Sequence, residues 1–248
     1  MSASGPPHYF SPRPDAPSRP SRVRLDLPDL SLELQVDRGV FSAGRIDPGT
    51  KVLLLEAPAP PSTGDVLDLG CGYGPIALAL AMRAPQATVW AVDVNERALD
   101  LTRANASAAG LGNVRVATPD GVPDDVRFAA IWSNPPVRVG KAVLHDLLST
   151  WLLRLTPAGR ALLVVQKHLG SDSLHRWLQQ QGWHVDRLTS RMAYRVLEVR
   201  RSGDDPAPPG DLGPDAPASL GEPAADPSAS SEAAVDPSAS GESGGPTP

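Results

Sequence analysis

The sequence predicts an α/β fold with a mostly parallel sheet and helices on both of its faces. Through the middle of the chain, apolar segments of strand length alternate with segments of helical period, a pattern typical of parallel strands joined by crossover helices. A glycine-rich turn at residues 70–74 separates the first of these strands from the helix that follows. Near residue 190 two strand-like runs are joined by a short turn, so they are expected to pair antiparallel.

The individual elements follow in order along the chain. Alternating residues over 23–35 predict a small N-terminal hairpin that turns at Pro28-Asp29, and residues 49–57 have a helical period. Val66, Val89, Val114 and Ile131 mark four strands, and residues 161–166 form a fifth. Helices are expected over residues 76–82, 96–109, 144–155 and 173–180, with the terminal hairpin over 184–188 and 194–200.

Composition divides the chain into a folded body with an extension at each end. With 41% apolar residues, the chain can build a substantial core. Residues 1–20, rich in Pro and Ser, are expected to be a mobile arm, and residues 21–201 carry the fold. From residue 202 to 248 the chain consists mostly of Pro, Ala, Ser, Gly and acidic residues, which cannot bury enough apolar surface to fold. We expect this segment to be a disordered acidic tail.

Charge, cysteine content and apolar runs limit the substrates, disulfides and cellular locations that the sequence allows. The chain has a formal charge of −5, but nine of its 28 acidic residues and none of its 23 Lys and Arg lie in the tail, so the body is mildly basic. Such a body suits an RNA substrate. Cys71 is the only cysteine, which excludes an intramolecular disulfide. The sequence has neither a secretory signal design nor an apolar run of membrane-spanning length, so a cytoplasmic protein is expected.

The strand and turn at residues 66–74 predict a cofactor site. Gly70, Gly72 and Gly74 have the spacing GxGxG, whereas GxGxxG is typical of turns that hold a pyrophosphate. Asp68 stands at the strand's end, where a carboxylate would repel phosphate but attract the ammonium and sulfonium of S-adenosylmethionine, directly or through water. This favours the methyl donor over NAD, which stays the alternative.

Two further polar positions follow the next strands. Asp93 ends the strand at residues 88–92, so it is expected beside the glycine turn, where it can accept hydrogen bonds from both ribose hydroxyls. Asp93 could instead cap the next helix, but Asn95, also assigned to the donor site, is better placed as that cap. Asp120 follows the third strand, in a position where such folds often contact the adenine amino group; an ordinary turn is the alternative.

Ser133-Asn134-Pro135-Pro136 predicts a catalytic corner. Residues that precede proline are held extended, and prolines offer carbonyls without amide hydrogens. The Asn134 side-chain oxygen and the Pro135 carbonyl, stiffened by Pro136, could hold both N–H bonds of a planar amine and aim its lone pair at a methyl group. The alternative is a proline turn that merely ends a strand. No hydrolase triad, HExxH or GxxxxGK[ST] signature is present, and no metal site is expected.

With these motifs the chain resembles the class I methyltransferases with a small methyltransferase domain, in particular the guanine-N2 methyltransferases of small-subunit ribosomal RNA. The resemblance covers His8-Tyr9-Phe10-Ser11, residues 37–42, residues 46–50, the cofactor turn, residues 133–141, Gln166-Lys167-His168 and residues 194–197. It implies a Rossmann-like, seven-stranded sheet. It further implies that S-adenosyl-L-methionine binds at the three glycines and Asp93, that residues 134–136 hold the target amine and that residues 39–42 close over the site.

The sequence departs from that family after the prolines, where many members have an aromatic residue that stacks on the target base. Here Val137 follows, then Arg138, Gly140 and Lys141. Substrate contacts are expected at Phe41, Arg138, Lys141 and Lys167, and the expected partner is ribosomal RNA or the small ribosomal subunit. Two alternatives stay open. One is methylation of a glutamine amide in a release factor, where Tyr usually follows the prolines, and the other is a non-catalytic donor-binding or RNA-binding module.

Overall fold

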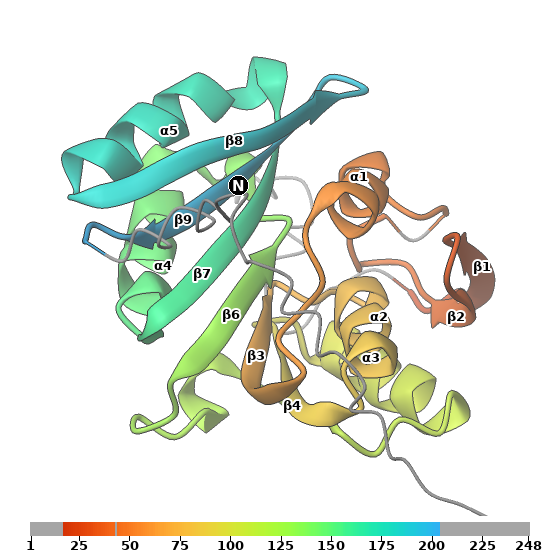
Figure 1. The fold of residues 1–248 in the computed structure, drawn as a ribbon. Helices are drawn as coiled ribbons and strands as arrows, with labels where there is room; N and C mark the ends of the chain where they lie inside the picture. Colours follow the sequence, from red (N-terminus) through yellow and green to blue (C-terminus); the bar gives the residue numbers. More distant parts are fainter. Residues whose placement is uncertain (1–16, 43, 204–248) are drawn as a thin grey trace, which may run out of the picture. The chain divides into compact units, whose positions relative to one another are not determined.

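A computed structural model of the chain describes residues 17–42 and 44–203. Most of the expected N-terminal arm and nearly all of the expected acidic tail lie outside the described residues, as does the His8 to Ser11 motif. The centre of the fold is a seven-stranded sheet with the order β5-β4-β3-β6-β7-β9-β8 (Figure 1). Its strands are β3 (Thr63–Leu69), β4 (Gln86–Val92), β5 (Val114–Ala117), β6 (Phe128–Ser133), β7 (Leu155–Gln166), β8 (Trp183–Arg191) and β9 (Tyr194–Arg201).

Strand directions confirm the predicted fold class. The pairs β3–β4, β4–β5, β3–β6 and β6–β7 are parallel, whereas β9 runs antiparallel to both β7 and β8. Because parallel strands end at the same edge of a sheet, the segments that follow β3, β4, β6 and β7 come together there. The final hairpin turns at Met192 and Ala193, both of which have positive φ.

Helices cover both faces of the sheet, as the alternating sequence pattern predicted. They are α1 (Pro48–Glu56), α2 (Pro75–Arg83), α3 (Glu96–Ala108), α4 (Lys141–Leu152) and α5 (Ser171–Gln180), with short 3-10 helices η1 (Pro119–Gly121), η2 (Val137–Val139) and η3 (Lys167–Leu169). Neighbouring strand residues point to opposite faces. Val66 therefore belongs to a core with α1, α2 and α3, whereas Leu67 belongs to a second core with α4 and α5.

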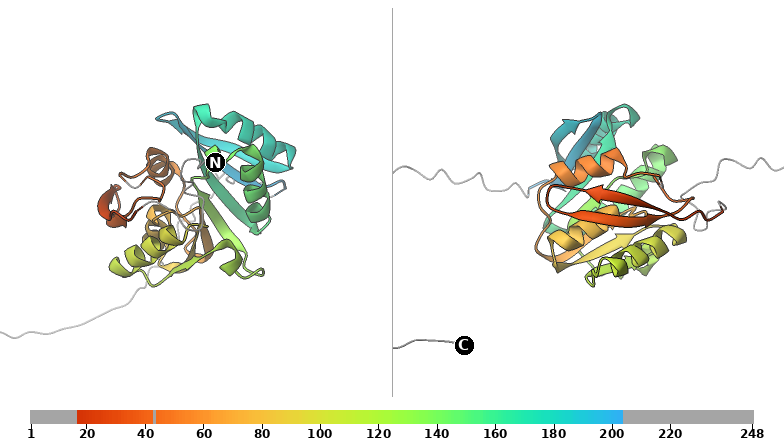
Figure 2. Two further views of the ribbon diagram at one scale, coloured as in Figure 1. Left: turned by 180° about the vertical axis from the view of Figure 1, so that it is seen from behind. Right: turned by 90° about the vertical axis from the view of Figure 1, so that its right-hand side faces the viewer.

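The small N-terminal hairpin is also present. Strands β1 (Ser21–Asp26) and β2 (Ser31–Val36) pair antiparallel as a separate two-stranded sheet. In the right-hand view of Figure 2 this hairpin lies across the molecule with α1 on one side and α3 on the other. The Asn105 side chain on α3 accepts a hydrogen bond from the Gln35 amide and donates to the Gln35 carbonyl. This double contact fixes the hairpin to α3.

Several boundaries differ from the prediction, most of all around α4 and the start of β7, which begins at Leu155 rather than at residue 161. Helix α4 begins at Lys141 rather than at residue 144 and ends at Leu152 rather than at residue 155. It begins early because Gly140, at φ 100°, turns the chain directly into the helix. It ends early because Leu155 already pairs with Phe128, after which the register shifts before regular pairing resumes at Arg160.

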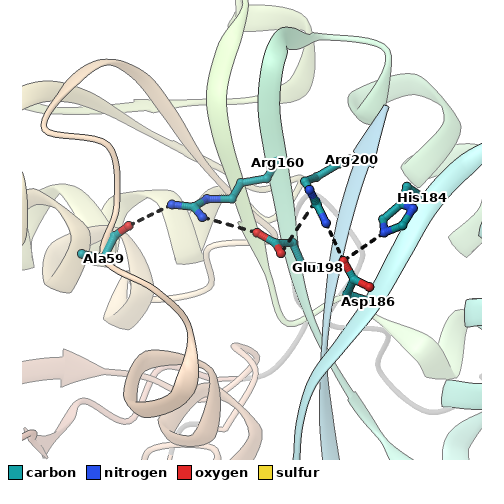
Figure 3. A network of polar contacts seen from close by, with 6 residues as sticks. All are labelled: Ala59, Arg160, His184, Asp186, Glu198 and Arg200. Atoms are coloured by element: carbon teal, nitrogen blue, oxygen red, sulfur yellow. Dashed lines mark hydrogen bonds and ion pairs between the residues drawn. The ribbon is translucent and has the colours of Figure 1, made fainter. Parts of the chain in front are cut away.

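A network of charged side chains holds β7, β8 and β9 together (Figure 3). Glu198 contacts both Arg160 and Arg200, and Arg200 donates in turn to Asp186. Arg160 also donates to the carbonyl of Ala59 in the segment after α1. Since Arg160 pairs with Arg200 in the middle of β7, six residues before Gln166 at its carboxyl end, we assign this network a structural role. Among the described residues, no helix combines the length and apolar character of a membrane span.

Candidate active site

A cavity of about 610 Å³ opens at the carboxyl edge of the parallel strands. This volume is within the usual range of roughly 300 to 1,000 Å³ for small-molecule sites. Its walls come from the segment before α1, the turns after β3, β4, β5 and β6, the end of β7, the start of β9, and α4. The lining residues with polar or aromatic side chains are Phe41, Asp47, Asp93, Asn95, Asn134, Arg138, Gln166 and Tyr194.

The glycine turn connects β3 to α2 through left-handed backbone. Gly70, Gly72 and Gly74 have φ of 77°, 56° and 93°, values that a side chain disfavours. Gly70 and Gly72 line the cavity, and a Cβ at either would meet no described atom within 4 Å. Gly74 lies behind the wall, where a Cβ would come within 2.8 Å of Leu78. The first two glycines therefore face the cavity, and the third allows α2 to pack closely.

Asp93 is fixed against this turn and lines the cavity. Its Oδ2 accepts a hydrogen bond from the Gly72 amide and its Oδ1 accepts one from the Asn95 amide, both at 2.9 Å. Burial raises the pKa of this carboxyl. Each oxygen keeps further acceptor capacity, so the geometry is compatible with the ribose contact predicted from the sequence. That contact stays a prediction.

Asn95 has the capping role that its position predicted, and it also lines the cavity. Its side-chain oxygen accepts from the Ala98 amide and caps α3. Its Nδ2 donates to the carbonyl of Gly39 at 2.9 Å. Asn95 thus joins the part of the cavity assigned to the methyl donor to residues 39–42. The resemblance assigned that segment as a cover over the site.

Asp68 does not lie on the cavity wall. It is fully buried behind the glycine turn, where its Oδ2 accepts from the Ala77 amide in the first turn of α2. Its Oδ1 has no hydrogen-bond partner within the described part of the chain. Burial raises the pKa of Asp68 to about 8, and the negative charge of Asp93 adds to the effect. The contact of Asp68 with S-adenosylmethionine, directly or through water, stays a prediction.

Asp120 also lies outside the wall. The residue that lines the cavity in this turn is Pro119, and the exposed carboxyl of Asp120 has its pKa lowered by a hydrogen bond from the Thr118 side chain. This local bond is typical of a turn, the alternative that the sequence left open. An adenine contact by Asp120 stays a prediction.

The corner formed by Asn134, Pro135 and Pro136 lines the cavity after β6, the strand that pairs with β3. It is anchored by Ser133, whose hydroxyl donates to the Leu69 carbonyl at 2.7 Å. The Pro135 carbonyl accepts from the Val137 amide at 2.8 Å, so part of its acceptor capacity is used within the loop. Pro136, with φ −75° and ψ 72°, sits at the centre of this tight turn.

The Asn134 side chain is held by the start of α1. Its Nδ2 donates to Asp47 Oδ2 at 2.8 Å and to Thr50 Oγ1 at 3.1 Å. Asp47 in turn caps α1 by accepting from the Thr50 amide at 3.0 Å. Sequence reasoning missed Asp47, although Asp followed by Pro is a readable helix start. Nothing local in the sequence indicates that this cap meets a residue 87 positions later.

Of the four predicted substrate contacts, the structure brings two to the cavity. Phe41 and Arg138 line it, whereas Lys141 and Lys167 are not among the described residues that do. Phe41 keeps 40% of its surface exposed. Tyr194, which the sequence analysis did not assign as a site residue, also lines the cavity. Within the described residues, no group of three or more His, Cys, Asp or Glu side chains could hold a metal ion.

Comparison with known proteins agrees with this geometry. The family model for the methyltransferase small domain matches residues 31–198. The uncharacterized protein YbxB of Bacillus subtilis is 32% identical over 197 residues, which cover 78% of this chain and 98% of that protein. Ribosomal RNA small subunit methyltransferase C of Shewanella halifaxensis is 35% identical over 154 residues, 60% of this chain and 44% of that protein.

Among solved structures, the T. thermophilus 16S rRNA N2 methyltransferase RsmC, in complex with AdoMet and guanosine, matches with a TM-score of 0.64 and 26% identity. The match covers 75% of this chain and 51% of that chain. The chain therefore spans about half the length of the ribosomal RNA methyltransferases cited above. Strand order, family model and solved relative together confirm the Rossmann-like class I methyltransferase fold, and the chain belongs to the methyltransferase small domain family.

Proposed function

We propose that this protein is an S-adenosylmethionine-dependent methyltransferase that modifies an exocyclic amine, specifically guanine N2 in small-subunit ribosomal RNA. The observation that carries the proposal is the side-chain amide of Asn134. Both of its hydrogens are taken by Asp47 and Thr50, and it lies on the wall of the cavity that Asp93 also lines. The oxygen proposed to hold the amine and the carboxylate proposed to hold the donor's ribose therefore belong to residues of one cavity wall.

The residues around the glycine turn fit the methyl donor. Asp93 presents a carboxylate, and Gly70 and Gly72 leave open space beside it. Val94 and Pro119 add apolar wall suited to a flat nucleobase. The GxGxG spacing of the turn, in place of the GxGxxG that holds a pyrophosphate, argues against a dinucleotide. When bound, the donor supplies an electrophilic methyl group on a sulfonium sulfur.

The residues of the corner would position the nucleophile. An aromatic amine is a weak nucleophile because its lone pair is delocalised into the ring. Asn134 Oδ1 and the remaining acceptor capacity of the Pro135 carbonyl would accept the two N–H bonds and leave the lone pair directed at the methyl group. Positioning of this kind can lower a barrier by roughly 7 to 11 kcal/mol. The same oxygens would stabilise positive charge as it develops on the nitrogen.

Residues of the cavity wall and the names of the relatives support the proposed substrate class. Phe41 and Tyr194 are aromatic residues of the wall, beside the aliphatic Val137, and Arg138 adds a cation suited to phosphate. Two of the three relatives cited above are named as ribosomal RNA methyltransferases, and the solved one of these two holds guanosine, whereas YbxB is named as uncharacterized. These observations favour a guanine in RNA over a peptide amide.

The test is transfer of labelled methyl from the donor to three probes: assembled small ribosomal subunits, naked 16S RNA and a translation release factor. We expect label in one of the two RNA probes, recovered as N2-methylguanosine after nuclease digestion. Label only in the release factor would show a glutamine methyltransferase instead. Donor binding by calorimetry with no transfer to any probe would indicate a non-catalytic module.

A further inference from the structure

We propose that Asp47 is a positioning residue which, together with Thr50, fixes the Asn134 amide in the orientation that presents its oxygen to the substrate. The inference deepens the proposed function and rests on it, because it concerns the same amine-holding corner. It assigns a role to the start of α1, a segment outside both the glycine turn and the proline corner.

The hydrogen bonds decide which way the amide faces. A side-chain amide has two N–H donors on nitrogen and an acceptor oxygen. At Asn134 the nitrogen lies 2.8 Å from Asp47 Oδ2 and 3.1 Å from Thr50 Oγ1, so both donors have partners. With the amide reversed, its oxygen would face the Asp47 carboxylate with no hydrogen between them. The contact with Asp47 thus selects one of two orientations and leaves Oδ1 as the acceptor for the substrate.

The carboxylate that makes this selection is itself held in place. Asp47 is the N-cap of α1, and the Oδ2 that receives the Asn134 amide also accepts from the Thr50 amide at 3.0 Å. A Cβ added at Gly49 would lie 2.9 Å from this Oδ2 and 2.7 Å from the Tyr194 ring. Asp47, the first turn of α1 and Tyr194 are therefore in close contact, and the carboxylate has little room to move.

The expected effect of losing Asp47 is on turnover rather than on donor binding. The torsion that rotates a side-chain amide is broad and roughly two-fold, so an unheld Asn134 would spend part of its time with its NH₂ group facing the substrate amine. The N–H groups of Asn134 and of the substrate amine would then face each other with no acceptor between them. A displacement of about 1 Å in a positioning group can lower a rate about 10²-fold. The Asp93 side of the cavity would be unchanged.

The first experiment compares variants that separate this contact from helix capping. Asp47→Ser keeps a good N-cap but is one bond too short to reach Asn134, and Thr50→Val removes the second acceptor while retaining the backbone N–H. We expect kcat to fall by about 10- to 100-fold in Asp47→Ser and by a few-fold in Thr50→Val, with an unchanged donor Kd. Asp47→Asn retains an acceptor oxygen and should recover much of the rate.

Two controls test whether Asp47 acts through Asn134. In the Asn134→Ala background, Asp47→Ser should change kcat less than twofold, because the group that it positions is gone. A full multiplicative loss in that background would overturn the proposal. Thr150→Val makes the matched chemical change on α4, where the hydroxyl donates to the Asp146 carbonyl of its own helix. It should leave kcat unchanged.

A second measurement needs no substrate, so it separates this inference from the proposed function. In ¹⁵N NMR spectra the Asn134 side-chain amide is assigned by its loss in Asn134→Ala. Its two protons should exchange with water at least about tenfold more slowly in the natural protein than in Asp47→Ser. Equal exchange rates would overturn the positioning role, whatever the RNA assays give. Slow exchange in a protein that methylates none of the three probes would support the amide orientation while refuting the proposed function.

Discussion

Asp68 should make the stability of this protein fall as the pH rises, and Asp68→Asn should remove that dependence. The carboxyl is fully buried behind the glycine turn, and burial raises its pKa from 3.8 to about 8. The folded state therefore keeps a proton that the unfolded chain gives up, so this contribution to stability is present at low pH and is lost between about pH 4 and pH 8. Asparagine resembles the protonated acid and does not titrate.

The size of the effect follows from the shift. Within that window each pH unit changes the free energy of unfolding by about 1.4 kcal/mol per group. Between pH 5 and pH 7.5 the natural protein should therefore lose about 3 kcal/mol more than Asp68→Asn, a large part of the roughly 5 to 15 kcal/mol that stabilises a domain.

Urea unfolding at the two pH values, followed by tryptophan fluorescence, measures this difference. The measurement is made without donor, because a ligand would add its own stabilisation. Equal slopes with pH in the two proteins would refute the reasoning, since they would mean that Asp68 is ionised in the folded state at neutral pH. The m-value should be the same for both proteins, which checks that the substitution does not alter the extent of unfolding.

The other predictions concern the cavity. Asn134→Ala should lower kcat by about 10² or more with donor affinity nearly intact; parallel losses of both would make Asn134 a scaffold residue. Asp93→Ala should raise the donor Kd at least about tenfold, since a bond to a charged group contributes about 1.5 to 3 kcal/mol, and unchanged calorimetric affinity would remove its ribose role. Gly74→Ala should lower the melting temperature, because a side chain at φ 93° is strained and would contact Leu78. Arg138→Ala should reduce the slope of log K against log salt for RNA binding by about one if Arg138 contacts a phosphate.

The sequence was most informative where local chemistry determines the structure. Strand and helix alternation, the two hairpins and the Asn95 cap were predicted because each depends on neighbouring residues. The end of α4 was predicted wrongly because its last turn is set by the pairing of Leu155 with Phe128, a contact between distant segments. Helical period alone extended the helix into that strand.

Most segments of the candidate site could be predicted from the sequence. The burial of each carboxyl and the contacts between distant residues could not. Asp68 and Asp93 both end β-strands in the sequence, yet one is buried behind the turn and the other lines the cavity. That difference depends on the pairing of the two strands, because Asp68 lies beside Ala91 within the sheet, two positions before the level of Asp93, and residue type does not reveal this register. The Asp47 contact to Asn134 joins segments 87 residues apart. Only the packing of α1 brings them together.

The N-terminal hairpin has a consequence for chimeras of this protein and its relatives. Asn105 holds Gln35 at the end of β2, and Asn95, next to Asp93, holds the Gly39 carbonyl. Another protein's hairpin, grafted onto this body, would keep the attachment only if its backbone placed hydrogen-bonding groups within reach of both Asn95 and Asn105. Residues 21–39 are therefore not an exchangeable module, and designs that retarget the protein should transplant them together with α3.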